Sequence, residues 1–214
     1  TAVIPIKEYR PNNYLFFATK EGIVKRTSLD AFENIRQSGL FAINLRDEDE
    51  LIGVRLTDGK QEIILGTRRG MAIRFSEEDV REMGRAATGV KGIRLREGDW
   101  VIGMDVADDK QDLLVVTSKG YGKRTPMTEY RRQTRGGIGV ITLNVTERNG
   151  PIVGLKTVST DHDLMLVTAL GVVIRLDVNE VSSMGRNTQG VRLIRLEEED
   201  EVATVAKVEI NDEE

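Results

Sequence analysis

The chain has 214 residues, of which 39% are hydrophobic, and it contains no cysteine and one histidine. A disulfide framework and a thiolate metal site are therefore excluded. No apolar run approaches the ~20 residues that a transmembrane helix requires, so we expect no membrane partner. This length and hydrophobic content allow one large domain or an array of small units around a shared core.

Charge is unevenly distributed along the chain. The formal net charge is −4, from 31 basic and 35 acidic residues. Nine of the acidic residues and one of the basic residues lie in residues 197–214, so residues 1–196 hold 30 basic and 26 acidic residues. Because local charge rather than the total steers a polyanion, a nucleic-acid partner is not excluded.

Residues 1–10 (TAVIPIKEYR) begin with a pattern that is typical of a strand. TAVIPI aligns with apolar runs that recur later in the chain, at 51–56, 101–106, 152–157 and 202–207. We therefore expect residues 1–10 to be the last strand of a preceding repeat, and the chain to be part of a longer one.

The rest of the chain is an internal repeat. A glycine turn that leads into an alternating apolar–polar strand recurs at Gly39, Gly89, Gly139 and Gly190, with spacings of 50, 50 and 51 residues. A fixed period of this size is typical of repeat architectures. The predicted single domain covers residues 11–209, with repeats at about 11–59, 60–109, 110–160 and 161–209 and an acidic tail at 210–214.

Each repeat contains the same predicted elements. An apolar strand ends in threonine and enters a T-x-x-G hairpin, whose glycines are Gly22, Gly70, Gly120 and Gly171. A second strand follows, then a polar segment such as 76–83 with at most one helical turn, the glycine turn with its strand, an acidic or polar turn, and a final strand. The period of two, rather than 3.6, predicts an all-β, propeller-like fold with four-stranded blades of about 50 residues.

The chain offers few residues for catalysis. His162 lies between two aspartates at a repeat boundary, and no second histidine or cysteine completes a site, so we interpret it as an exposed loop residue. The acidic pairs Asp108–Asp109 and Asp161/Asp163 are interpreted as turn residues. No phosphate-binding loop or dinucleotide fingerprint is present. We therefore expect no catalytic residue, no metal site and no cofactor in this chain.

The remaining repeated signal is basic. Arginines stand four residues before three of the turn glycines, Arg36 stands three before Gly39, and other basic residues follow the turn glycines or the hairpin glycines at fixed spacing. The predicted nucleic-acid-binding residues are Arg135, Arg85, Arg186, Lys91, Arg192, Arg131, Arg132, Lys25, Arg26, Lys123, Arg124, Arg74 and Arg175. Repeated at one position of each blade, such residues would form a basic rim that contacts phosphates without reading bases. The alternative is that they pair with the equally abundant acidic residues.

Four segments carry a family resemblance: TDGKQEIILGTRRGMAIRF (57–75), VREMGRAATGVKGIRL (80–95), DLLVVTSKGYGKRTPMTEYR (112–131) and EVSSMGRNTQGVRLIRL (180–196). They closely resemble the C-terminal domain of the DNA gyrase A subunit, and less closely that of its topoisomerase IV relative. The resemblance extends over essentially all 214 residues. It implies a β-pinwheel, in which neighbouring blades exchange strands and double-stranded DNA wraps around a basic outer rim.

The same resemblance implies a role and partners. In the family, wrapping serves negative supercoiling by DNA gyrase, an ATP-dependent type IIA topoisomerase whose cleavage tyrosine and ATPase lie in other domains or subunits. The implied partners are double-stranded DNA, the gyrase B subunit, and the rest of the gyrase A subunit. The implied location is the bacterial cytoplasm, in association with the nucleoid.

Two features depart from the family pattern. The gyrase polypeptide usually has six blades, whereas four and one leading strand are predicted here, so we expect the first two blades to be missing or lost. The nearest match to the family's Gln-Arg/Lys-Arg-Gly-Gly-Arg/Lys-Gly box has Thr134 and Ile138 where basic residues are expected, and we interpret it as a degenerate copy. This copy consists of Gln133, Thr134, Arg135, Gly136, Gly137, Ile138 and Gly139.

Two other functions remain open from the sequence. One is the C-terminal domain of a topoisomerase IV-like subunit. The other is a protein-interaction propeller without DNA wrapping, in which the arginines are structural. A further hypothesis is that the acidic segment Glu209–Glu214 competes with DNA for the rim.

Overall fold

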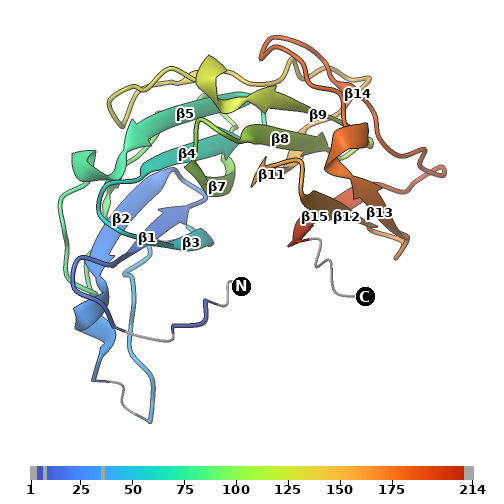
Figure 1. Ribbon diagram of the computed structural model, residues 1–214. Coiled ribbons are helices and arrows are strands. Elements are labelled where there is room, and N and C mark those ends of the chain that lie inside the picture. The colour runs from blue at the N-terminus through green and yellow to red at the C-terminus, as the bar shows by residue number, and fades with distance from the viewer. Residues whose placement is uncertain (1–3, 7–8, 35–36, 210–214) are drawn as a thin grey trace.

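A computed structural model describes residues 4–6, 9–34 and 37–209 (Figure 1). Small antiparallel sheets, or blades, follow one another around an arc. The strands are β1 (Tyr14–Thr19), β2 (Ile23–Ser28), β3 (Leu51–Thr57), β4 (Glu62–Thr67), β5 (Met71–Ser76), β6 (Val90–Lys91), β7 (Val101–Ala107), β8 (Asp112–Thr117), β9 (Tyr121–Pro126), β10 (Val140–Ile141), β11 (Ile152–Val158), β12 (His162–Thr168), β13 (Val173–Asp177), β14 (Val191–Arg192) and β15 (Val202–Glu209). The 3₁₀ helices are η1 (Leu29–Phe32), η2 (Glu77–Asp79), η3 (Met127–Glu129) and η4 (Val178–Glu180).

Three blades are completed by a strand from the next repeat. Their strand orders are β3-β1-β2-β6, β10-β5-β4-β7 and β11-β8-β9-β14, which we number blades 1 to 3. Blade 4 has three strands among the described residues, in the order β13-β12-β15. Because β6, β10 and β14 each pair with the blade of the preceding repeat, the predicted β-pinwheel with strand exchange is confirmed.

The hydrophobic core lies between successive blades. Ile63 and Leu65 of β4 pack with Phe16 of blade 1, whereas Ile64 packs with Leu113 of blade 3. Successive side chains of a strand point to opposite faces, so a strand between two blades must be apolar on both. This explains why the first strand of each repeat reads as an almost continuous apolar run.

The inner strands of the arc, β3, β7, β11 and β15, contact one another in that order. Each of the first three carries a glycine that receives a side chain from the next blade. A Cβ on Gly103 would lie 3.1 Å from the side chain of Leu155, and one on Gly154 would lie 2.2 Å from that of Val205. These glycines therefore allow the blades to approach closely at their inner edge.

The outer strands are joined with a constant register. In each joint, the residue after a hairpin glycine pairs with the residue two positions after a turn glycine. The pairs are Ile23 with Lys91, Met71 with Ile141, and Tyr121 with Arg192. The turn glycine itself lies against the accepting strand: Gly139 has φ +83°, and a Cβ there would lie 2.3 Å from the carbonyl oxygen of Ala72.

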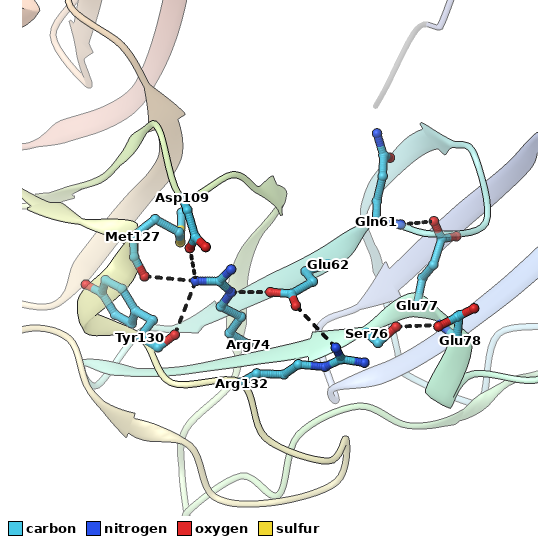
Figure 2. Close-up of polar contacts among 10 residues, drawn as sticks. All are labelled: Gln61, Glu62, Arg74, Ser76, Glu77, Glu78, Asp109, Met127, Tyr130 and Arg132. Carbon is cyan, nitrogen blue, oxygen red and sulfur yellow. Dashed lines mark hydrogen bonds and ion pairs between the residues drawn. The ribbon is translucent and has the colours of Figure 1, made fainter.

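A buried arginine ties blade 2 to blade 3 (Figure 2). Arg74, four residues after its hairpin glycine, forms an ion pair with Glu62 across the hairpin. The same guanidinium donates to Asp109, in the turn before β8, at 2.7 Å and to the carbonyl oxygen of Met127, in η3, at 3.1 Å. Arg74 is thus a structural link between repeats, with 9% of its side chain exposed.

The other repeats vary this link. Arg124 donates to Asp112 at 2.7 Å and to the carbonyl oxygen of Val181 at 2.8 Å. Arg26 lies over the ring of Tyr14, with 4.7 Å between its guanidinium carbon and the ring centroid. In every case the partner stands 12 residues earlier, at the start of the first strand of the repeat.

The predicted short helical turn at 76–83 is confirmed as η2, where the Ser76 hydroxyl accepts from the N–H of Glu78 at 3.2 Å. The predicted strand at 1–10 lies partly outside the described residues. Its described residues form no strand, but Ile4 and Ile6 pack against the core of blade 1. Residues 210–214, the predicted tail, lie outside the described residues, so both predictions remain open. Within the described ranges, no helix is both long and apolar enough to span a membrane.

Replacement of Arg74 by alanine should lower the free energy of unfolding by about 2–4 kcal/mol. The reason is that Glu62, 22% exposed, and buried carbonyl groups would lose their donor. Equilibrium urea denaturation measures the loss.

The matched control is Arg175→Ala. Arg175 occupies the same repeat position and pairs with Asp163, but 62% of its side chain is exposed. We expect this variant to lose about 1 kcal/mol or less. Equal losses in the two variants would contradict the assignment of Arg74 as an inter-blade link.

Candidate nucleic-acid interface

The outer edge of the arc is built from segments that we call the rim segments: residues 37–46, 81–96, 131–146 and 182–197. Each of the last three crosses the outside of the preceding blade, where its two-residue strand pairs. Neighbouring rim segments also bond to each other: Gly136 N–H donates to Gly92 O at 2.6 Å, and Arg94 N–H donates to Gly137 O at 2.7 Å. The rim is therefore a continuous surface made from residues about one repeat apart.

Two of the predicted binding arginines fasten this surface. Arg135 donates to the carbonyl oxygens of Asp79 at 2.8 Å and Lys91 at 3.0 Å. Arg186 donates to the carbonyl oxygen of Ile141 at 2.9 Å, the equivalent position one repeat later. Both are half-buried, so each holds its own rim segment against the previous one while part of its side chain remains accessible.

Arg85 lies at the same repeat position as Arg135 and is also half-buried. It lines a surface pocket together with Gly39, Leu40 and Phe41 of the first rim segment. The three arginines that stand four residues before a turn glycine therefore all lie where two rim segments meet.

Lys25 and Lys123 lie inside the protein rather than on its surface. Both side chains are fully buried. The Lys25 ammonium donates to the carbonyl oxygens of Ala42 and Arg85, and Lys123 donates to that of Gly185 at 2.6 Å. We therefore do not carry forward the prediction that these lysines contact nucleic acid; they hold rim segments in place.

Burial changes the protonation of these lysines. It lowers the pKa of Lys25 from 10.5 to about 8, and the neighbouring Arg85 acts on that pKa in the same direction. Burial likewise lowers the pKa of Lys123 from 10.5 to about 8. In the even repeats, isoleucines (Ile73 and Ile174) occupy the same position, so this ammonium link is confined to the odd repeats.

The arginines after the hairpin glycines are mostly structural as well. Arg74 is buried, and Arg26 and Arg124 are half-buried in the contacts described above. Arg175, in blade 4, is exposed apart from its ion pair with Asp163. In blades 1 to 3 their repetition in the sequence coincides with contacts that hold the fold together.

Only some of the predicted DNA-binding residues are exposed on the rim. Lys91, Arg131, Arg132 and Arg192 are all exposed. Arg132 lies 3.6 Å from Glu62, and Arg192 donates to the hydroxyl of Tyr121 at 3.0 Å. These contacts engage one nitrogen of each guanidinium group, and 57% of the Arg132 side chain is exposed.

Sequence reasoning missed further exposed rim arginines, of which Arg94 and Arg195 share a repeat position. Both stand five residues after a turn glycine in an even repeat, and this shared spacing was the signal that could have found them. The odd repeats have Asn44 and Asn144 at this position. Cations at this position of the rim therefore alternate with a period of two repeats.

Cations lie on both the second and the third rim segments, which bond to each other. Lys91 and Arg94 come from one segment, and Arg131, Arg132 and Arg135 come from the next. Charged side chains and backbone N–H groups of a glycine-rich loop are the usual ligands of phosphate oxygens. The chemistry of this cluster therefore fits a polyanion backbone.

The degenerate box lies within this cluster. Gly136 has φ +80° and Gly139 has φ +83°, so both need glycine. Ile138 is 44% exposed, and Thr134 is exposed on the same turn. The box thus presents a tight turn on the rim, with Arg135 as its one cation.

The single histidine is not where the sequence placed it. His162 is the first residue of β12 and is 6% exposed, so the interpretation as an exposed loop residue is wrong. Its Nδ1 accepts from the N–H of Ser159 at 2.9 Å, which closes the turn before the strand. In the part of the chain that the structure describes, no cluster of His, Cys, Asp or Glu could hold a metal ion.

The fold and the rim together define a class: a propeller of strand-exchanging blades with basic residues along its outer edge. The sequence matches the family described as "DNA gyrase C-terminal domain, beta-propeller" four times, at residues 13–58, 61–108, 111–159 and 162–209. The chain therefore belongs to the family of DNA gyrase A C-terminal domains. The resemblance seen in the sequence is confirmed.

Relatives agree with this assignment. The DNA gyrase A subunit of Halalkalibacterium halodurans is 71% identical over 214 residues, which are 100% of this chain and 26% of that protein. The DNA gyrase A subunit of Staphylococcus aureus is 51% identical over 211 residues, which are 97% of this chain and 24% of that protein. The chain thus spans about a quarter of the length of these relatives.

Solved structures share the fold. The C-terminal domain of a DNA topoisomerase IV superposes with a TM-score of 0.90 at 32% identity, over 96% of this chain and 65% of that one. A DNA gyrase A C-terminal domain superposes with a TM-score of 0.85 at 27% identity, over 94% of this chain and 68% of that one.

The buried lysines make stability depend on pH. Between the folded pKa of about 8 and the unfolded value of 10.5, the unfolded chain binds more protons, so the lysines make the free energy of unfolding rise with pH. A Lys25→Met/Lys123→Met variant lacks this contribution. We expect urea denaturation at pH 7, 8.5 and 10 to show wild type gaining stability relative to the variant above pH 8. If the free energies of unfolding of wild type and variant change in parallel with pH, the lowered pKa values of the two buried lysines are contradicted.

Proposed function

We propose that this chain binds double-stranded DNA along the rim segments and bends it around the outside of the arc. The observation that carries the proposal is the cluster of exposed cations on the second and third rim segments, Lys91, Arg94, Arg131 and Arg132. These residues lie on one outer edge and neighbour glycine turns, whose backbone can approach a phosphate closely. Contacts of this kind bind phosphates without selecting a base sequence.

The family supports a role for this bending. In a protein built like the gyrase A relatives, DNA that is bent around the rim would be led toward the rest of the A subunit, and this would serve negative supercoiling together with the B subunit. The location we propose is the bacterial cytoplasm, at the nucleoid. No catalytic residue or cofactor of this chain takes part.

The expected affinity depends strongly on salt. Each phosphate that a cation neutralises releases counterions, and log K falls by about 0.9 per unit of log salt for each such contact. Two unrelated duplexes should therefore bind with similar affinity and with the same steep salt slope.

A Lys91→Ala/Arg94→Ala variant should bind both duplexes about tenfold more weakly and with a salt slope lower by about one to two units. Fluorescence anisotropy across a salt series measures both quantities. The matched control is Lys60→Ala/Lys110→Ala, which removes the same charge from two exposed lysines that lie outside the rim segments. The control should keep the wild-type slope.

Two outcomes would overturn the proposal. If neither duplex binds at low salt, or if the control variant loses as much affinity as the rim variant, the rim is not the binding surface. If the duplex binds but the distance between labels at its two ends does not change, the chain binds DNA without bending it, and the bending part of the proposal is wrong. Capture of a protein ligand with no duplex binding would favour the protein-interaction alternative.

A further inference from the structure

Exposed apolar side chains are rare in the middle of the chain, and they gather on the rim. Between residues 57 and 169, all of which the structure describes, Ile138 and Ile141 are the only large hydrophobic residues that are exposed, at 44% and 37%. Both belong to the third rim segment. This segment bonds to the second through Gly136 and to the fourth through Asn144, so its exposed surface does not depend on either end of the chain.

These isoleucines stand where the neighbouring repeats have polar side chains. Ile141 has the same place in its joint as Lys91 and Arg192 have in theirs. Ile138, one residue before its turn glycine, corresponds to Thr88 and Gln189. No charged residue occurs in residues 138–146, which we call the nonionic stretch, whereas the corresponding parts of the second and fourth rim segments contain cations.

The position five residues after the turn glycine follows the same alternation. Asn144 stands there in the nonionic stretch, and Arg94 and Arg195 stand there in the second and fourth rim segments. The Asn144 backbone is fixed, because its N–H donates to the carbonyl oxygen of Thr188 at 2.8 Å and its own carbonyl oxygen accepts from Asn149 at 2.9 Å. Its side-chain amide is exposed and forms no hydrogen bond with any described residue, so it can bind a ligand.

Duplex DNA has two kinds of surface, and the rim has side chains for both. Phosphates accept hydrogen bonds from cations, whereas the grooves expose base edges and apolar groups such as the thymine methyl. Isoleucine has no donor for a phosphate but packs well on the carbon surface of a groove. An asparagine amide can donate to the edge of adenine in either groove. A duplex that lies along a surface turns its backbones and its grooves toward that surface in succession.

We propose that the nonionic stretch contacts a groove of the DNA through Ile138, Ile141 and Asn144, between phosphate contacts that the cations of the neighbouring rim segments make. This inference rests on the proposed function, because it assigns a groove of the bound duplex to one part of the rim. The acceptor for the amide is an adenine edge, N7 in the major groove or N3 in the minor groove. Since a mixed sequence offers an adenine within a few base pairs of any position, unrelated duplexes still bind alike.

A salt series separates the groove contact from the phosphate contacts. An Ile138→Ala/Ile141→Ala/Asn144→Ala variant should bind a duplex about three- to tenfold more weakly than the wild type at every salt concentration. Its salt slope should equal that of the wild type, because the lost contacts release no counterions. The Lys91→Ala/Arg94→Ala variant lowers the slope instead. Fluorescence anisotropy measures both quantities.

The matched control for the lost apolar surface is Leu51→Ala/Leu56→Ala. Both leucines are 38% exposed, and both lie on the inner strand β3. This variant should bind with the affinity and the slope of the wild type. Urea denaturation of the control and of the triple variant verifies that each is folded.

Modified duplexes locate the amide contact. In one duplex a carbon replaces N7 of the adenines (7-deazaadenine), and in the other a carbon replaces N3 (3-deazaadenine). The wild type should bind one of the two about threefold more weakly than the unmodified duplex, whereas Asn144→Ala should bind all three alike. A loss with the first duplex assigns the contact to the major groove, and a loss with the second assigns it to the minor groove.

Three results would overturn the proposal. They are a triple variant with wild-type affinity, a triple variant with the lowered slope of Lys91→Ala/Arg94→Ala, and modified duplexes to which the wild type and Asn144→Ala respond equally. Each of these leaves the proposed function intact as long as Lys91→Ala/Arg94→Ala still lowers the slope. Absence of binding to any duplex at low salt would overturn the proposed function and this inference together.

Discussion

The fold depends on one interaction, the pairing of a two-residue strand from each of the second, third and fourth repeats with the hairpin of the repeat before it. This pairing completes a blade, buries the hairpin and brings the turn glycine against the neighbouring backbone, as at Gly139 and Ala72. Because the donor strand and the outer surface belong to the same segment, the joint that holds the blades together also builds the rim. The residues that stabilise the fold and those of the proposed binding surface therefore lie on the same segments.

This sharing divides the basic residues into two groups. Arg74, Lys25 and Lys123 are buried, and they bond to carboxylates or carbonyl groups that would otherwise lack a donor. Arg94 and Lys91 are exposed on segments that those contacts hold in place. The buried group fixes the backbone on which the exposed group is displayed, so a periodic arginine can be essential to the fold without belonging to the proposed DNA-binding surface.

Local patterns in the sequence predicted much of this structure. The hairpins, their glycines and the η2 turn follow from residue types within a few positions of one another, and the four blades follow from the period of about 50 residues. The structure confirms both. The burial of Lys25 did not follow, because its carbonyl partner at Arg85 lies 60 residues away. Arg94 and Arg195 occupy the same position of the second and fourth repeats, whereas the first and third repeats have asparagine there. Only a comparison of repeats two apart therefore shows that these arginines recur. His162 was misplaced because β12 begins one residue before the apolar run.

The central claim is that the rim segments, and not the inner strands, form the DNA-binding surface. Hydrogen–deuterium exchange of the chain with and without a duplex tests this most directly, since exchange reports local protection along the backbone. The account predicts added protection in residues 81–96, 131–146 and 182–197, strongest where the second and third rim segments meet, with β7 and β11 unchanged. Added protection confined to β3, β7, β11 and β15 would contradict it.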